Sequence, residues 1–275
     1  MEYKNSEHQF IDFFKMIKQL SIVALGLFVF GCSSSKKTIS FSKNQVIAHR
    51  GAWKKNGFPQ NSIASLDYAI ALKCAGSEFD VRMTADDSLV INHDSVYNNL
   101  HIEKTKYTDL LAFKLSNGDK LPTLREYIVA GIKNNSTTKL ICEIKPSDIS
   151  KERGEIIASK VLQLVRELKA ENWMVYISFD FEILKKIIAL NTTAKTQYLE
   201  ANKTPKELMV EGISGADYYY SDFKVHPEWI KSAKKNHILL NAWTVNDSVE
   251  MDWFLSNNFD FITTNEPEML LEKLK

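Results

Sequence analysis

The sequence predicts an α/β protein built on a closed (β/α)₈ barrel, known as a TIM barrel. Short apolar segments alternate with helix-like amphipathic segments from residue 46 onward. Eight such strand–helix units fill about 230 residues, near the ~250 residues that barrels of this kind usually need. No G-x-G-x-x-G turn follows the first strand, which disfavours the alternative of a doubly wound open sheet.

The predicted strands are short apolar runs, and most of the helices after them have a recognisable start. Strands are expected at residues 46–49, 77–81, 139–144, 175–178, 196–199, 217–221, 238–243 and 261–264. Helices are expected at 62–74, from 123, at 151–168, at 181–190, and from 205, 227, 247 and 267. Thr123 followed three residues later by Glu126 is a capping box. A short extension at 89–92 and a polar segment at 95–120 separate the second strand from its helix.

The composition excludes several classes of protein. The 275 residues include 35 Lys and Arg against 34 Asp and Glu, a net charge of +1, and basic residues form no long tract. We therefore expect no nucleic-acid partner. Three cysteines cannot form a disulfide framework, and we expect Cys74 and Cys142 to be buried free thiols.

The N-terminal segment has the features of an export signal. Two lysines precede an 11-residue apolar run at 20–30, which is too short to span a membrane as a helix. Gly31 and Cys32 follow, and residues 29–32 resemble the bacterial lipobox, in which the Cys is lipidated. The sequence thus predicts a lipoprotein anchored to a membrane of the bacterial cell envelope, facing the periplasm or the exterior. The expected division is a signal peptide at 1–31, the lipidated Cys32 with a tether at 32–43, and a barrel domain at 44–275.

Charged side chains gather where the predicted strands end, which is where a barrel of this type builds its active site. Glu78 and Asp80 are two residues apart, so both face the same side of their strand, the lumen. Glu143 and Lys145 have the same spacing in the third strand. The candidates are two histidines, an arginine, a lysine, three carboxylates and a tryptophan: His49, His93, Arg50, Lys145, Glu78, Asp80, Glu143 and Trp243.

This set of side chains favours phosphate chemistry. Neighbouring carboxylates repel one another, so either one is protonated or a cation bridges them. Hard divalent cations such as Ca²⁺ and Mg²⁺ prefer oxygen ligands. Two histidines supply a general base and a general acid near neutral pH. Arg50 and Lys145 suit phosphate oxygens, so the reaction class indicated is cleavage of a phosphate ester.

Eight short motifs occur in a characteristic order. They are HRG at 49–51, PQNS at 59–62, EFDV at 78–81, LVINHD at 89–94, LPTL at 121–124, EIK at 143–145, WTVN at 243–246 and ITTN at 262–265. No single motif is specific, but the ordered set resembles the glycerophosphodiester phosphodiesterase family over nearly the whole barrel.

The resemblance implies hydrolysis of a small phosphodiester to glycerol 3-phosphate and an alcohol, with Ca²⁺ or Mg²⁺. It also implies that residues 95–120 form a short cap insertion after the second strand. The implied roles are acid/base catalysis by His49 and His93, metal binding by Glu78, Asp80 and Glu143, phosphate binding by Arg50 and Lys145, and a glycerol or alcohol pocket lined by Trp243.

Two positions depart from the family pattern and keep alternatives open. Gln60 stands where the family usually has Glu, and Asn265 where Asp is common, so two negative charges are absent. One alternative is a related barrel phosphodiesterase acting on inositol or lysophospholipid head groups. The other is a lipid-anchored protein that binds glycerophosphodiesters without cleaving them. A third alternative is a metal-dependent aldolase-type barrel, but its carbonyl chemistry requires neither the His-Arg motif at 49–50 nor the His-Asp motif at 93–94.

Overall fold

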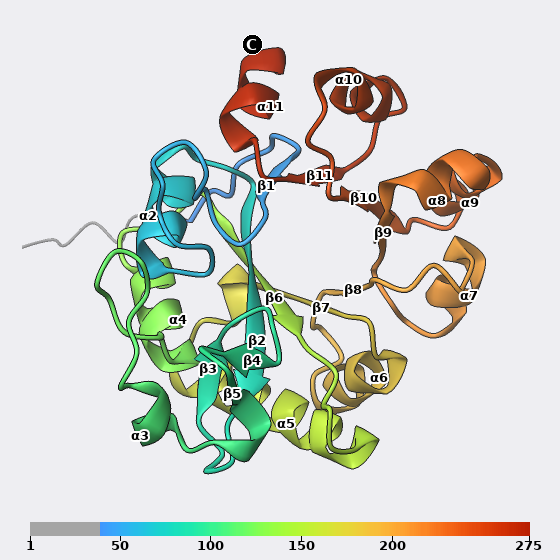
Figure 1. Ribbon diagram of the computed structural model, residues 1–275. Helices are drawn as coiled ribbons and strands as arrows, with labels where there is room; N and C mark the ends of the chain where they lie inside the picture. Colours follow the sequence, from blue (N-terminus) through green and yellow to red (C-terminus); the bar gives the residue numbers. More distant parts are fainter. Residues whose placement is uncertain (1–38) are drawn as a thin grey trace, which may run out of the picture. The chain divides into compact units, whose positions relative to one another are not determined.

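Eight parallel strands close into a barrel in the computed structural model, which describes residues 39–275 (Figure 1). They are β1 (Val46–Ala48), β2 (Gly76–Met83), β6 (Lys139–Ile144), β7 (Met174–Ser178), β8 (Thr196–Tyr198), β9 (Gly215–Tyr219), β10 (Leu239–Trp243) and β11 (Phe261–Thr264). Each strand pairs with its neighbours in chain order, and β1 pairs with both β2 and β11, which closes the ring. The predicted barrel is confirmed.

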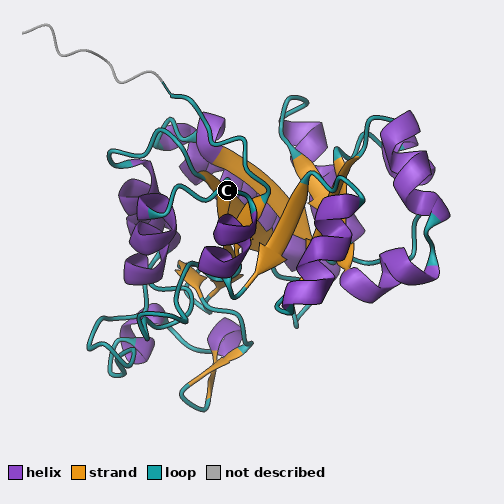
Figure 2. Ribbon diagram, turned by 90° about the horizontal axis from the view of Figure 1, so that it is seen from above, coloured by secondary structure: helices purple, strands orange, loops and turns teal. Residues whose placement is uncertain are grey.

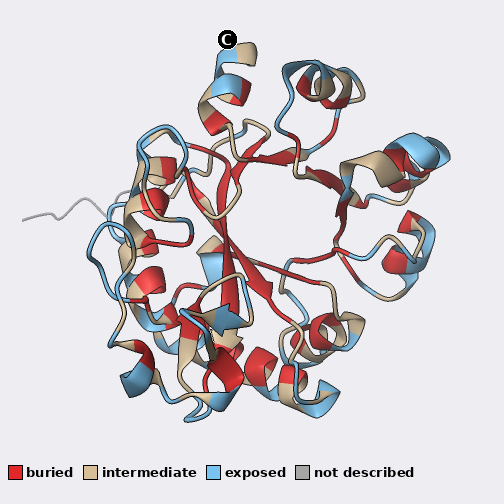
Figure 3. Cartoon of the chain, viewed as in Figure 1, coloured by how far each residue is buried: buried red, intermediate tan, exposed pale blue. Residues whose placement is uncertain are grey.

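Helices surround the strands with their buried sides turned inward, as the red inner and pale blue outer surfaces in Figure 3 show. They are α2 (Ile63–Ala71), α4 (Leu124–Ile132), α5 (Lys151–Glu167), α6 (Phe181–Leu190), α7 (Pro205–Val210), α8 (Tyr220–Val225), α9 (Glu228–Lys235), α10 (Ser248–Ser256) and α11 (Pro267–Lys273). In α5, the fully buried Ile157, Val161 and Val165 recur every four residues and form one apolar stripe. Within residues 39–275, no helix combines the length and apolar character that crossing a membrane requires.

A small apolar cluster fills the lumen of the barrel. It consists of Ile47, Ala75, Ile141, Ile177 and Leu199. Ile47 and Ile141 lie two residues before His49 and Glu143 on the same faces of their strands, because side chains alternate along a strand. The side chains two residues before His49 and Glu143 are therefore apolar, whereas the polar side chains of the site come from positions nearer the carboxyl ends of these strands.

The segment between β2 and α4 carries extra structure. β3 (Leu89–Ile91) runs antiparallel to β2, which agrees with the predicted extension. The polar stretch after it, for which the sequence predicts only a short cap insertion, contains the hairpin β4 (Val96–Tyr97) and β5 (Leu100–His101), the 3₁₀ helix η1 (Ile102–Lys104) and α3 (Tyr107–Leu110). The hairpin extends past the barrel strands in Figure 2. Val90, Ile102, Leu110 and Leu121 form a separate buried cluster that stabilises this segment.

The sixth parallel strand differs from its prediction. The sequence predicts it at 217–221, whereas β9 ends at Tyr219 and α8 begins at Tyr220. Three consecutive tyrosines have a high β-propensity, which shifts the predicted strand two residues along the chain. The predicted signal peptide at 1–31, Cys32 and most of the predicted tether lie outside the described residues. Cys74 and Cys142 are buried free thiols, as predicted.

Candidate active site

The turn after β1 orients His49 and Arg50. Arg50 and Gly51 both have positive φ angles, 56° and 80°. A Cβ on Gly51 would lie 2.3 Å from Ser65 Oγ, so only glycine fits there. The turn aims the backbone N–H of Arg50 at Glu78 Oε2, to which it donates a hydrogen bond of 2.8 Å. The glycine of the HRG motif is thus required by the geometry of the turn, and the other two residues supply functional groups to the site.

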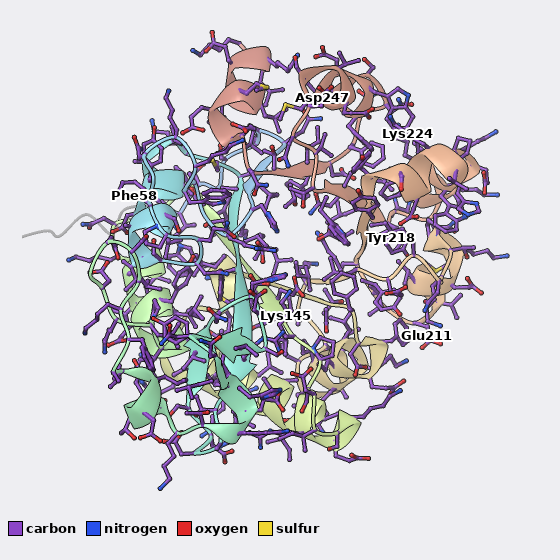
Figure 4. All side chains as sticks on the ribbon, in the orientation of Figure 1. Phe58, Lys145, Glu211, Tyr218, Lys224 and Asp247 are labelled. Carbon is purple, nitrogen blue, oxygen red and sulfur yellow. The ribbon has the colours of Figure 1, made fainter. Side chains whose placement is uncertain are left out.

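Three carboxylates and one lysine meet at the carboxyl ends of β2 and β6. Asp80 is 1% exposed, and Lys145 Nζ lies 2.8 Å from its Oδ1 and 2.6 Å from Glu143 Oε1. Asn61 Nδ2 donates to the other oxygen of Asp80 at 2.7 Å. Lys145 lies beside the open centre of the barrel in Figure 4. Glu78 completes the group, and the predicted lumen orientation of both pairs is confirmed.

β3 returns the chain to this site and so positions His93. Because β3 runs antiparallel to β2, its end lies beside the middle of β2, and the N–H of Asn92 donates to the carbonyl of Asp80 at 3.0 Å. Arg82 Nε donates to the carbonyl of His93 at 3.0 Å, which fixes the backbone there. An antiparallel return of a few residues therefore brings the second histidine to the mouth of a parallel barrel.

Each histidine is held through its Nδ1 atom. His49 Nδ1 lies 2.8 Å from Asn265 Oδ1, and His93 Nδ1 lies 2.7 Å from Asp94 Oδ1. Both partners are oxygens that accept, so each Nδ1 carries the proton, and in a neutral ring Nε2 keeps its lone pair. Both rings line the same cavity with this second nitrogen available.

The two histidines differ in their electrostatic surroundings. Burial, followed by the charge of Arg50, lowers the pKa of His49 to about 4. Burial also lowers the pKa of His93, but the carboxylates of Asp80 and Asp94 oppose the effect. The His93 side chain is 39% exposed and that of His49 19%. His49 is thus neutral at physiological pH, and His93 takes up a proton more readily.

The acidic group has an excess of negative charge. Burial, followed by Asp80 and Glu143, raises the pKa of Glu78 well above its usual range. Burial and Asp80 raise the pKa of Glu143 to about 7. Glu78, Asp80 and Glu143 each offer an oxygen within 4.8 Å of the others. Oε1 of Glu78 is buried and accepts no hydrogen bond from residues 39–275. Oxygen ligands that are buried, convergent and under-neutralised suit a hard divalent cation.

The site opens into a cavity of about 270 Å³ with two unlike walls. One wall is charged and comes from β1, β2, β3 and β6. The other comes from β7, β8 and β10 and is largely apolar, with Ile177, Phe179, Leu199 and Trp243. The rings of Phe179 and Trp243 meet edge to face at 5.5 Å. A ligand with an anionic centre and a carbon skeleton matches this division.

The structure brings the eight predicted site residues together. Seven of them line the cavity, and Asp80 lies behind Lys145 and Glu143. Sequence reasoning missed Asp217, a fourth carboxylate that lines the same cavity from β9. The signal that could have found it is its spacing: Gly215, Asp217 and Tyr219 share one face of β9. The predicted strand began at Asp217, which placed this residue at the amino end of the strand and not near the carboxyl end, where site residues are expected.

Comparisons with known proteins agree with the geometry. The model of the glycerophosphoryl diester phosphodiesterase family matches residues 49–269. A glycerophosphodiester phosphodiesterase from Caldanaerobacter subterraneus is 28% identical over 250 residues, 85% of this chain and 98% of that protein. A crystal structure of a glycerophosphodiester phosphodiesterase from Parabacteroides distasonis has 39% identity and a TM-score of 0.82, and the match covers 86% of this chain and 98% of that one.

A more distant structure shares the fold. A phosphodiesterase from Oleispira antarctica, solved in complex with the product sn-glycerol-3-phosphate, has a TM-score of 0.72 at 22% identity, covering 84% of this chain and 96% of that one. The family model spans most of the barrel and includes every candidate catalytic and metal-binding residue. This chain therefore belongs to the glycerophosphoryl diester phosphodiesterase family.

Proposed function

We propose that this protein hydrolyses glycerophosphodiesters to glycerol 3-phosphate and an alcohol by metal-assisted acid/base catalysis. The observation that carries the proposal is that two histidines with available Nε2 atoms line one cavity together with Glu78 and Glu143 of the buried carboxylate triad. The family match and the names of the relatives support the same substrate class.

The carboxylates Glu78, Asp80 and Glu143 would hold a Ca²⁺ or Mg²⁺ ion. When bound, the cation supplies positive charge that neutralises a phosphodiester and the charge that develops on it. Lys145 already neutralises Asp80, lowering its pKa against the opposing effect of burial. The remaining charge of the triad is what the cation would balance.

Arg50 and Lys145 would orient the phosphate. Arg50 Nη1 donates to Gln60 Oε1 at 2.7 Å, which holds the guanidinium at the cavity edge. Its planar fork suits two phosphate oxygens, whereas Lys145 acts as a point charge. Trp243, on the opposite wall, would pack against the carbon skeleton of the glycerol or alcohol group.

His49 would act as the general base and His93 as the general acid. The neutral His49 ring has an unprotonated Nε2 that removes a proton from the nucleophile. Attack by water gives glycerol 3-phosphate directly, whereas attack by the neighbouring hydroxyl of the glycerol group gives a cyclic phosphate that water then hydrolyses. His93 would protonate the leaving alkoxide, because Asp94 favours its imidazolium form. The amide of Asn265 also favours the imidazolium of His49, but burial and the charge of Arg50 outweigh it and hold the pKa of His49 at about 4.

We also propose that the enzyme is a lipoprotein of the bacterial cell envelope, anchored through Cys32. The support is in the sequence: a short apolar run at 20–30 followed by Gly31 and Cys32. Metabolic labelling with a fatty-acid analogue tests it, with Cys32→Ala as the unlabelled control. Equal labelling of both proteins would contradict the assignment.

The decisive experiment is turnover of glycerophosphocholine, glycerophosphoethanolamine and glycerophosphoinositol by the purified protein, with release of glycerol 3-phosphate as the readout. Ca²⁺, Mg²⁺ and EDTA arms test metal dependence, and we expect EDTA to abolish release. His49→Ala and His93→Ala should each lower kcat by about 10²–10⁴-fold without lowering Tm.

Three results would count against the proposal. Full activity in either histidine variant would remove the catalytic assignment. Release of an inositol phosphate, cyclic or open, would place the phosphate on the other product and favour the related barrel phosphodiesterase. Calorimetric binding of all three compounds without turnover would favour the non-catalytic binding protein.

A further inference from the structure

Asp217 is a buried carboxyl group to which the proposed mechanism gives no role. It is 1% exposed and lines the cavity from β9. Its Oδ1 atom is buried and accepts no hydrogen bond from any residue between 39 and 275. Burying a polar atom without a hydrogen-bond partner has a free-energy cost. A ligand group that supplies the missing hydrogen bond would offset this cost.

The position of Asp217 fixes how deep that ligand group must reach. In the paired strands β9 and β10, Asp217 lies opposite Asn241, and Tyr219 opposite Trp243. Asp217 is therefore one layer deeper in the lumen than Trp243. The indole Nε1 of Trp243 donates to the backbone carbonyl of Asp217 at 2.9 Å, which locks the two residues together. A ligand group that enters from the mouth of the barrel must therefore extend past Trp243 to contact Asp217.

The surroundings of Asp217 suit a hydroxyl group. Thr263 Oγ1 donates to Asn241 Oδ1 at 3.1 Å, so the Thr263 hydroxyl hydrogen is not available to Asp217. Burial, followed by the charge of Glu143, raises the pKa of Asp217 well above its usual range, with Asn241 partly opposing. A protonated carboxyl group both donates and accepts hydrogen bonds, as an alcohol does. Asp217 is absent from the group of oxygens that converge as a metal site.

We propose that Asp217 is a substrate-binding residue that hydrogen-bonds a hydroxyl of the glycerol group and so selects glycerol phosphates over simple alkyl phosphates. The glycerol group is common to all the proposed substrates, whereas the alcohol varies. An enclosed contact below Trp243 suits the glycerol group, which is constant. The alcohol, which varies, would extend toward solvent. This inference rests on the proposed function.

The test compares two ligands that differ in their hydroxyl groups. Calorimetry of the full-length protein in Ca²⁺ measures Kd for glycerol 3-phosphate and for n-propyl phosphate. We expect the wild type to prefer glycerol 3-phosphate by about 10-fold or more, as one hydrogen bond supports. Asp217→Ala should lose most of that preference and weaken glycerol 3-phosphate alone, while its Tm stays equal or rises because the unpartnered carboxyl is gone.

Gln197→Ala is the matched control. Gln197 is a buried polar residue of the adjacent strand β8 with its own unpartnered Oε1, but it does not line the cavity. We expect this variant to keep the wild-type preference.

Other outcomes separate this inference from the proposed function. If the wild type binds neither phosphate and cleaves no glycerophosphodiester, the proposed function itself fails. The inference about Asp217 fails in two cases in which the wild type still turns over substrate. In the first, Asp217→Ala keeps the full preference for glycerol 3-phosphate. In the second, the wild type itself shows no preference. A weakened Kd for Ca²⁺ in Asp217→Ala would make it a metal ligand and would also overturn the inference.

Discussion

Gln60 shows how a substitution can preserve a contact while removing a charge. Its Oε1 accepts the hydrogen bond from Arg50 Nη1 at 2.7 Å, and an amide oxygen does this as a carboxylate would. We therefore expect Gln60→Glu to change kcat/KM for glycerophosphocholine by less than about 3-fold, because exposed charge pairs contribute only ~0–1 kcal/mol. Gln60→Ala, which removes the acceptor, should raise KM. A change above about 10-fold in Gln60→Glu would show that the charge matters.

Asn265 provides a second residue-scale prediction, concerning pH. Asn265→Asp would place a negative charge 2.8 Å from Nδ1 of His49 and stabilise its imidazolium form, raising the pKa. A general base works only when neutral, so activity is lost as pH falls through its pKa. The acid limb of the kcat/KM profile should therefore move to higher pH in Asn265→Asp. Asn265→Ala tests the loss of the acceptor alone, and superimposable wild-type and Asn265→Asp profiles would argue against His49 as the base.

At the scale of the secondary-structure element, the capping box predicted from the sequence is present at the N-terminus of α4. Thr123 and Glu126 form a complete capping box, with Glu126 N donating to Thr123 Oγ1 at 3.2 Å and Thr123 N to Glu126 Oε2 at 3.0 Å. Thr123→Ala should lower stability by about 1 kcal/mol, a fall in Tm of roughly 2–4 °C.

Two further variants make this prediction specific. Thr123→Ser keeps the hydroxyl and should restore most of the lost Tm. Thr204→Ala removes the matching box of α7 and should act similarly. Calorimetry measures Tm, and kcat should stay within about 2-fold of wild type, because a cap supports its helix alone. An unchanged Tm in Thr123→Ala would show that tertiary contacts hold α4.

The same scale shows what the sequence could and could not predict. Strands with a clear helix start after them, such as β6 before α5, are predictable because caps and apolar spacing are local signals. The hairpin β4–β5 is not, since its two-residue strands pair only with each other and lack an apolar alternation. Asp217 was missed for a different reason: a two-residue error in β9 put it at the amino end of the predicted strand, away from the carboxyl ends where site residues are expected.

Residues at strand ends were the most predictable part of the site. Their placement follows from barrel topology, so the HRG and EIK motifs could be assigned to one mouth without coordinates. The contacts of Asn265 and Gln60 could not, because each joins a histidine or arginine to a loop through side-chain geometry. Sequence spacing predicts which residues meet, whereas hydrogen-bond partners depend on the folded backbone.

At the scale of the whole molecule, the triad of Glu78, Asp80 and Glu143 links the free energy of unfolding to pH and to metal binding. Burial and Asp80 raise the pKa of Glu143 to about 7 from an ordinary value of 4.5. Between these values the folded protein holds a proton that the unfolded chain has released, so the free energy of unfolding falls as pH rises. Metal-free protein should therefore have a lower Tm at about pH 8 than at about pH 5.

A divalent cation should reverse this trend, because it binds deprotonated carboxylates. At 100 times Kd it stabilises by about 2.7 kcal/mol, roughly 5–10 °C in Tm for a domain of this size, with a smaller effect at acid pH. Glu143→Gln is the matched variant: it removes the titrating group, so both the pH slope and the metal-induced shift should shrink. Calorimetric scans with Ca²⁺ or EDTA at both pH values measure this. An equal metal-induced shift at both would mean that the triad is already ionised in the free protein, and that Lys145 alone balances its charge.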